Sequence, residues 1–153
     1  MLDFNYPQHY AEVVRATDWK IDLPEAWSDY FHESGVAPVN YCDQRQAQRR
    51  IVRTCGLLYF EKALPSFPRA FHPVGIFTRD FSKNACGILS PVELFPEEEV
   101  RLILPTFWLQ LRVVRAYRHQ AKCFEIGLRL LHRNSPCRDA FVVGGRFAEV
   151  EKG

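Results

Sequence analysis

The chain has 153 residues, of which 47% are hydrophobic and 25% are charged, and its formal net charge at pH 7 is +2. This length and apolar content suffice for a core of its own, so we expect one small domain. The small net charge does not favour a general binder of polyanions. Electrostatic function would have to come from local clusters of charge.

The sequence predicts neither insertion into a membrane nor secretion. No apolar run approaches the roughly 18 residues of a spanning helix, and the N-terminus lacks the basic start and apolar stretch of a signal peptide. The five cysteines are odd in number, widely spaced and free of any CxxC pair, which favours reduced thiols in a cytoplasmic protein. The histidines are equally scattered, so we expect no metal site.

A first helix is predicted over residues 6–17. Tyr10, Val13 and Val14 share one face of such a helix. Pro7 lies in its first turn, where proline is tolerated because the missing N–H would have no partner there.

A second helix is predicted to begin near Pro24 and to end at Gly35. Trp27, Tyr30 and Phe31 follow at helical spacing and form an aromatic stripe. Such a stripe indicates contact with the core or with a second subunit, so a homodimer stays open.

A polar link over residues 40–48 leads into an arginine-rich arm, whose members are Arg45, Arg49, Arg50 and Arg53. We place the domain boundary in this link, with a helical extension over 1–43 and the main domain over 44–153.

From Arg53 onward, β-rich runs alternate with turn residues, which is typical of a β-sandwich or a β-barrel. The predicted strands are 54–62, 74–79, 85–90, 100–104, 108–117 and 123–131. A proline-rich loop over 63–73 separates the first two strands, and residues 118–121 are predicted to turn between the last two.

A C-terminal helix is predicted after the last strand. Ser135 can cap it, with Pro136 at its first position, and the helix runs through Ala140 and Val143. The glycine pair at 144–145 ends it.

Two polar motifs flank the first predicted hairpin. Arg49 and Arg53 are four residues apart, and an arginine can bind phosphate, pair with the acceptor edge of guanine and stack on a base. Asp80 and Ser82 share one face of a strand, where a carboxylate can accept from the N–H groups of guanine. Each motif alone is weak, because basic clusters are usually solvated and Asp and Ser are ordinary turn residues. Their joint occurrence points to a nucleotide site.

Together these motifs resemble the PilZ domain family, in which an RxxxR arm and a [DN]xSxxG strand entry bind cyclic di-GMP, a bacterial second messenger. The corresponding segments here read RRIVR at 49–53 and DFSKNA at 80–85, and residues 124–130 resemble the closing strand of that domain. The resemblance covers about the last two thirds of the chain. It implies a mainly β fold, namely a six-stranded antiparallel barrel with a helical N-terminal extension and a C-terminal helix.

The resemblance also implies a cyclic di-GMP receptor or effector without enzymatic activity, which changes conformation on binding and signals through a partner protein that the sequence does not identify. No other cofactor is implied. The residues implied to bind the nucleotide are Arg49, Arg50, Arg53, Asp80, Ser82 and Ala85, with Arg45, Gln48 and Gly87 as additional contacts.

Ala85 departs from the family pattern, because it stands where the second motif ends in glycine. If glycine there serves a positive φ or a close approach of the ligand, alanine weakens binding. Gly87, two residues later on the same face, could take over that role.

The register of the arm has one alternative, since Arg45 and Arg49 also form an RxxxR pair. We prefer Arg49 and Arg53 because Arg53 directly precedes the strand. Gln48, directly before the arm, has neither a charge nor a guanidinium plane to hold a second nucleotide, so we expect one nucleotide per protomer.

Two other classes of function stay open. The first is a degenerate PilZ-type module that binds a protein and no nucleotide. The second is a β-barrel that stacks single-stranded nucleic acid on Tyr59, Phe60, Phe77 and Trp108, although the low total charge disfavours nucleic acid. No GxSxG, HExxH or P-loop pattern is present, so we do not expect an enzyme.

Overall fold

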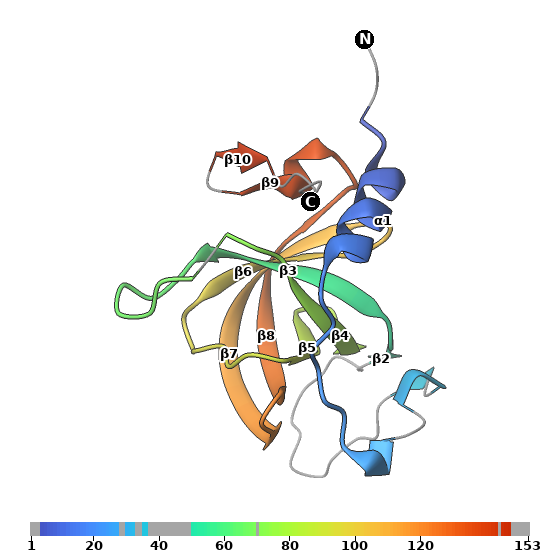
Figure 1. Ribbon diagram of the computed structural model, residues 1–153, viewed down its shortest axis with the longest axis vertical. Helices are drawn as coiled ribbons and strands as arrows, with labels where there is room; N and C mark the ends of the chain where they lie inside the picture. Colours follow the sequence, from blue (N-terminus) through green and yellow to red (C-terminus); the bar gives the residue numbers. More distant parts are fainter. Residues whose placement is uncertain are drawn as a thin grey trace.

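A computed structural model of the protein describes residues 4–27, 30–32, 35–36, 50–69, 71–143 and 145–147. Over these residues the fold is mainly β, with a closed antiparallel barrel and one α-helix near the N-terminus (Figure 1).

The six predicted strands all form and close into one barrel. They are β3 (Cys55–Lys62), β4 (Val74–Phe81), β5 (Ala85–Ser90), β6 (Glu99–Ile103), β7 (Trp108–Gln120) and β8 (Cys123–Asn134). The strand order is β4-β3-β6-β7-β8-β5, and pairing of β5 with β4 closes the ring. The prediction of a six-stranded antiparallel barrel is therefore confirmed.

The barrel is held together by side chains that alternate inward along each strand. They form one apolar core, to which every strand contributes and in which Leu58, Ile76, Ile88, Leu102, Leu111 and Ile126 are fully buried. Two short strands, β1 (Gly35–Val36) and β2 (Arg50–Ile51), extend the sheet beyond β4.

The turn between β7 and β8 lies at residues 121–122 and not over 118–121 as predicted. The two strands continue to pair as far as Gln120 and Cys123. The N-terminal segment fixes this extended tip, because Asp22 N–H donates to the Lys122 carbonyl at 3.0 Å and the Gln120 side chain donates to the Asp22 carbonyl at 2.6 Å.

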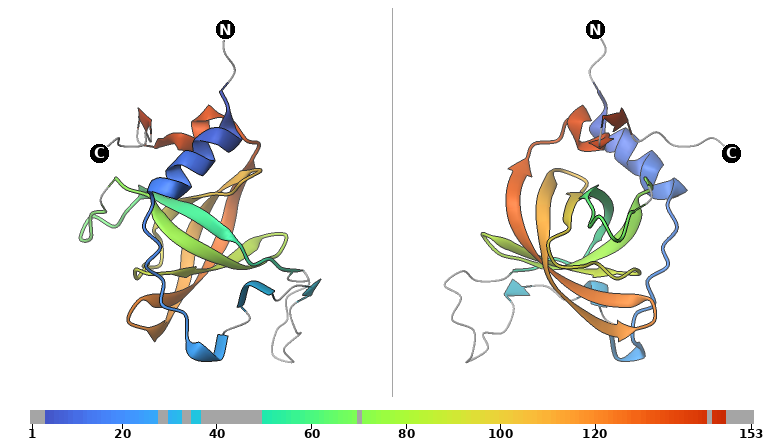
Figure 2. Two further views of the ribbon diagram at one scale, coloured as in Figure 1. Left: turned by 45° about the vertical axis from the view of Figure 1, so that its right-hand side comes forward. Right: turned by 90° about the vertical axis from the view of Figure 1, so that its left-hand side faces the viewer.

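The first predicted helix is confirmed as α1 (Tyr6–Ala16), which Asn5 caps by accepting from the Gln8 N–H at 3.1 Å. Tyr6, Tyr10 and Val13 bury one face of α1. They pack against outward-facing side chains of β3, β6 and β7, and against the C-terminal segment, which lies at the same end of the molecule (Figure 2).

The prediction of a second helix is wrong for the described residues between Pro24 and Gly35. This segment contains two 3-10 turns, η1 (Glu25–Trp27) and η2 (Tyr30–His32), and then β1. The aromatic stripe packs on the barrel wall: Tyr30 donates to the Thr78 carbonyl at 2.5 Å, and the ring of Phe31 meets Phe77 edge-on. These wall contacts override the helical spacing of the rings.

The predicted C-terminal helix is also wrong. Only η3 (Arg138–Phe141) forms, and a hairpin of β9 (Val142–Val143) and β10 (Arg146–Phe147) follows it. Buried Arg101 donates to the carbonyls of Asp139, Ala140 and Val142. Carbonyls that accept from a guanidinium do not supply the i to i+4 bonds of an α-helix, and the paired β-branched valines favour a strand.

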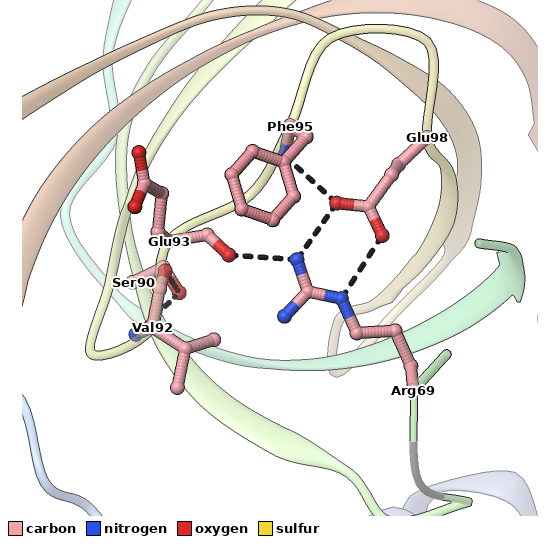
Figure 3. A network of polar contacts seen from close by, with 6 residues as sticks. All are labelled: Arg69, Ser90, Val92, Glu93, Phe95 and Glu98. Carbon is pink, nitrogen blue, oxygen red and sulfur yellow. Dashed lines mark hydrogen bonds and ion pairs between the residues drawn. The ribbon is translucent and has the colours of Figure 1, made fainter. Parts of the chain in front are cut away.

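A buried ion pair ties the loop after β3 to the loop before β6 (Figure 3). Arg69 donates to both carboxylate oxygens of Glu98, at 2.8 and 3.0 Å, and to the Glu93 carbonyl at 2.8 Å. The Phe95 N–H also donates to Glu98, at 2.7 Å. Since the Glu98 side chain is fully buried, these bonds replace its lost water.

Candidate functional site

The end of the arginine-rich arm runs antiparallel to the C-terminal half of β4. Arg50 pairs with Phe81 and Ile51 with Asp80. Buried Thr78 fixes this register, because its hydroxyl donates to the Val52 carbonyl at 2.5 Å and accepts from the Thr54 N–H at 2.9 Å. The fold therefore brings the two sequence motifs side by side.

Arg53 lies half-buried between the arm and the N-terminal segment. Its guanidinium carbon is 4.2 Å from the centre of the Tyr30 ring, which is the geometry of a cation–π contact. Burial raises the pKa of the Tyr30 hydroxyl, and the nearby positive charges of Arg53 and Arg79 oppose that rise.

A β-bulge presents Arg79 and Asp80 together over Gly87. The pairing shifts between Thr78 and Asp80, so that Arg79 and Asp80 together oppose one residue of β5, which is Gly87. A Cβ atom on Gly87 would lie 2.8 Å from the Asp80 carboxylate oxygen and 3.6 Å from the Arg79 Cβ. Gly87 is thus glycine because the buried Asp80 carboxylate occupies the space over its backbone.

Gly127 of β8 pairs directly with Gly87, so two neighbouring positions on the outer face of the sheet have no side chain. A Cβ atom there would come within 2.9 Å of the Arg115 side chain. The two glycines form the floor of a shallow outer groove of about 240 Å³, between Asn84 and Ala85 on one side and Arg115 and Arg129 on the other. We call this the outer groove.

The charges beside the outer groove are partly paired. Arg79 forms an ion pair with Glu125 at 2.9 Å, and His119 contacts the same carboxylate at 3.3 Å. Arg115 and Arg129 are both exposed at the other side. The net charge of the lining is therefore positive, which suits an anionic ligand.

Ser82 and Ala85 form the turn between β4 and β5. The Ser82 N–H donates to the Ala85 carbonyl at 2.9 Å. Glu97 is the one non-glycine residue with a positive φ in the described part of the chain, so Ala85 has an ordinary strand backbone. The missing glycine at 85 therefore imposes no backbone strain, and Gly87 is where the backbone is closely approached.

Arg50, Ser82 and Ala85 also line a second and larger cavity, of about 660 Å³, at one open end of the barrel. Of the predicted site residues, Gly87 lines the outer groove and Ala85 lines both cavities. The Asp80 carboxylate lies over Gly87, and Arg53 lines neither cavity. Arg45, Gln48 and Arg49 lie outside the described residues.

No protein-family model and no curated protein matches this chain.

Sequence reasoning missed Arg79, Arg115, Gly127 and Arg129 at the outer groove. Gly127 carries a readable signal, because a glycine inside a predicted strand often marks a close approach of a backbone or ligand. The arginines carry none, since neither the bulge nor the register of β7 against β8 can be read from spacing alone.

Other chemistry finds little support in the described part of the chain. No group of three His, Cys, Asp or Glu side chains there could hold a metal ion. None of the helices described is both long and apolar enough to cross a membrane. Tyr59 and Trp108 are buried, and Phe77 packs against Trp19 and Tyr30, so these rings are engaged in packing and not presented to bases.

Proposed function

We propose that the protein is a PilZ-like receptor module that binds cyclic di-GMP and passes the signal to a partner protein. The observation that carries the proposal is the register of the arm on β4, which pairs Ile51 with Asp80 and brings the motif at 49–53 alongside the motif at 80–85. The sequence separates these motifs by a strand, a loop and a second strand.

Each group has a role that its chemistry allows. Arg53, whose guanidinium lies over the Tyr30 ring, has a planar group that can stack on a base and N–H donors that can bind phosphate. Asp80 offers a carboxylate to the N–H groups of guanine. Arg115 and Arg129 line the outer groove, and their guanidinium groups can donate to phosphate over the two glycines, where a ligand can approach the backbone closely.

The conformational response is expected in the arm. It is fixed at its end by Thr78, and Arg53 links it to the aromatic segment around Tyr30. A nucleotide that takes over the contact of Arg53 would alter how Tyr30 and its neighbours pack, which would change the surface that a partner sees.

Calorimetric titration of the purified chain with cyclic di-GMP tests the proposal. We expect saturable binding with about one nucleotide per protomer, and much weaker binding of the linear dinucleotide pGpG, because the opened ring loses the fixed spacing of its two phosphates. A stoichiometry of two that Gln48→Arg does not change would contradict the predicted role of Gln48. Absence of heat and of any thermal shift at millimolar nucleotide would refute the proposal.

A degenerate PilZ-type interaction module is the second candidate. It is favoured by the internal pairing at the outer groove, where Asp80 is only 6% exposed and Arg79 already forms an ion pair with Glu125. In that case the same titration gives no nucleotide binding, while the fold and its aromatic segment stay intact.

A further inference from the structure

The larger cavity opens at the end of the barrel that lies away from the β7–β8 turn. Its volume is about 660 Å³, which falls within the range of small-molecule sites in proteins. Its walls are mainly apolar side chains that face the inside of the barrel, namely Phe81, Cys86, Leu104, Leu109, Leu111 and Leu130. We call this cavity the barrel mouth.

The rim of the barrel mouth is cationic. Arg50 of β2, Lys83 of the β4–β5 turn and Arg133 of β8 line it, and all three are exposed. Among the described residues, no carboxylate lines the barrel mouth and none of these three cations takes part in an ion pair. An exposed cation alone is ordinary surface, but three from separate elements around one apolar opening give a directed charge pattern.

The rim is also fixed in position. The hydroxyl of Tyr6 on α1 donates to the carbonyls of Leu104 and Phe107, at 2.6 and 3.1 Å, and so holds the turn between β6 and β7. The guanidinium carbon of Arg133 lies 4.5 Å from the centre of the Phe107 ring. A preformed rim lowers the entropy lost when a ligand binds.

We propose that the barrel mouth binds a single-chain amphipathic anion of the fatty-carboxylate class. The alkyl chain lies against the partly buried side chains of Phe81, Phe107 and Leu130, and the carboxylate stays at the rim between Lys83 and Arg133. Transfer of methylene groups from water to the apolar walls is favourable, and the cationic rim favours a negative head group over a neutral one. This cavity shares Arg50, Ser82 and Ala85 with the residues expected to bind the nucleotide, whereas Asp80 and Gly87 lie on the outside of the barrel.

Calorimetry of the full chain with octanoate, decanoate and dodecanoate, each below its micellar concentration, tests the inference. We expect one ligand per chain, with affinity rising about threefold to fourfold for each added methylene. Dodecanol, which has the same chain and no charge, should bind at least about tenfold more weakly than dodecanoate.

Two variants and a control assign the binding to this cavity. Leu130→Trp at the half-buried wall should obstruct the barrel mouth and weaken dodecanoate binding at least about tenfold. The double variant Lys83→Glu with Arg133→Glu changes two exposed rim positions and should weaken dodecanoate binding at least about tenfold. The matched reversal Lys122→Glu, in the exposed turn at the far end of β7 and β8, should leave it unchanged.

The inference is overturned if the wild-type chain shows no saturable dodecanoate binding, if dodecanol binds as tightly as dodecanoate, or if Lys122→Glu weakens binding as much as the rim variant. Cyclic di-GMP titrated into each variant keeps the two sites apart. Loss of nucleotide binding in Arg53→Ala with dodecanoate binding retained would support two sites.

Discussion

The side chain of Arg53 contacts the aromatic ring of Tyr30. The sequence predicts an exposed and solvated arginine at this position. In the structure it is half-buried and stacks on Tyr30, which is itself 2% exposed and hydrogen-bonded to Thr78. Removing its side chain therefore affects both the proposed ligand contact and the packing of the N-terminal segment.

Arg53→Ala should abolish cyclic di-GMP binding and also lower the free energy of unfolding by about 0.5 to 2 kcal/mol, the range of a cation–π contact. Arg53→Lys keeps the charge but loses the planar fork, so it should retain stability better than affinity. Calorimetric titration and thermal unfolding measure the two effects. Full retention of nucleotide affinity in Arg53→Ala would remove this residue from the site.

Gly87 and Gly127 provide a matched pair for testing the floor of the outer groove, because they face each other across β5 and β8. Gly87→Ala places a methyl group 2.8 Å from the buried Asp80 carboxylate, so we expect a loss of about 1 to 3 kcal/mol in stability and weaker nucleotide binding.

Gly127→Ala is the control, because the Arg115 side chain that its methyl group would meet is exposed and can move aside. Alanine lowers the conformational entropy of the unfolded chain, so the free energy of unfolding should stay unchanged or rise by about 0.5 kcal/mol. Urea denaturation of both variants compares them, and equal effects would show that Asp80 does not confine Gly87.

At the scale of elements, the ion pair of Arg69 and Glu98 joins the loop after β3 to the loop before β6. Glu98→Ala removes one partner of a pair in which Glu98 is fully buried and Arg69 is 10% exposed. The guanidinium then keeps its bond to the Glu93 carbonyl but loses the carboxylate, and the Phe95 N–H loses its acceptor. We expect a loss of about 3 to 5 kcal/mol in the free energy of unfolding.

Lys62→Ala is the matched control, because Lys62 is 79% exposed and its nitrogen is 4.0 Å from the Glu99 carboxylate. Its effect should stay within about 1 kcal/mol. Chemical denaturation of both variants gives the comparison. A small effect of Glu98→Ala would mean that water replaces the carboxylate.

The strands could be predicted from the sequence and the flanking helices could not, for a physical reason. Apolar residues alternate along each strand, as at Val100, Leu102 and Leu104. In the closed barrel these side chains all point into the core, so the pattern can be recognised in each strand separately. The rings of Trp27 and Tyr30 fit a helix by spacing, but they equally fit a chain that lays them on a barrel wall. Whether these residues form a helix or an irregular segment depends on where the barrel wall lies, which the local sequence does not reveal.

For the candidate site, too, some residues could be predicted from the sequence and others could not. The two motifs could be found because each is continuous in the sequence. The outer groove's Arg115 and the barrel mouth's Arg133 could not, since each is placed by the register of β7 and β8 and by the barrel's closure.

At the scale of the whole molecule, buried tyrosines tie stability to alkaline pH. Burial raises the pKa of Tyr59 to about 12, and it raises the pKa of Tyr6, Tyr10 and Tyr30 further. The unfolded chain loses these phenolic protons near pH 10, whereas the folded chain keeps them. The stabilisation from Tyr59 is therefore complete below pH 10 and is lost as the pH rises through 12, and that from the other three tyrosines is lost at higher pH.

Each such tyrosine should contribute up to about 1.4 kcal/mol per pH unit in that window. Tyr59→Phe, which cannot ionise, should make the loss of unfolding free energy less steep above pH 10 and leave its pH dependence below pH 9 unchanged. Urea denaturation at a series of pH values measures both slopes. An unchanged slope above pH 10 would mean that Tyr59 ionises in the folded chain as it does in the unfolded chain.

The closure of the barrel by β5 has a consequence for how the chain folds. The β4–β5 and β7–β8 hairpins join neighbours in sequence, but Ala85 of β5 must find Arg129 of β8, which lies 44 positions later (129 − 85). Non-local pairings of this kind make folding slow, on the order of milliseconds to seconds. During synthesis, one side of β5 has no strand to pair with until β8 has left the ribosome, so a nascent chain that stops before β8 presents an open strand edge to its neighbours.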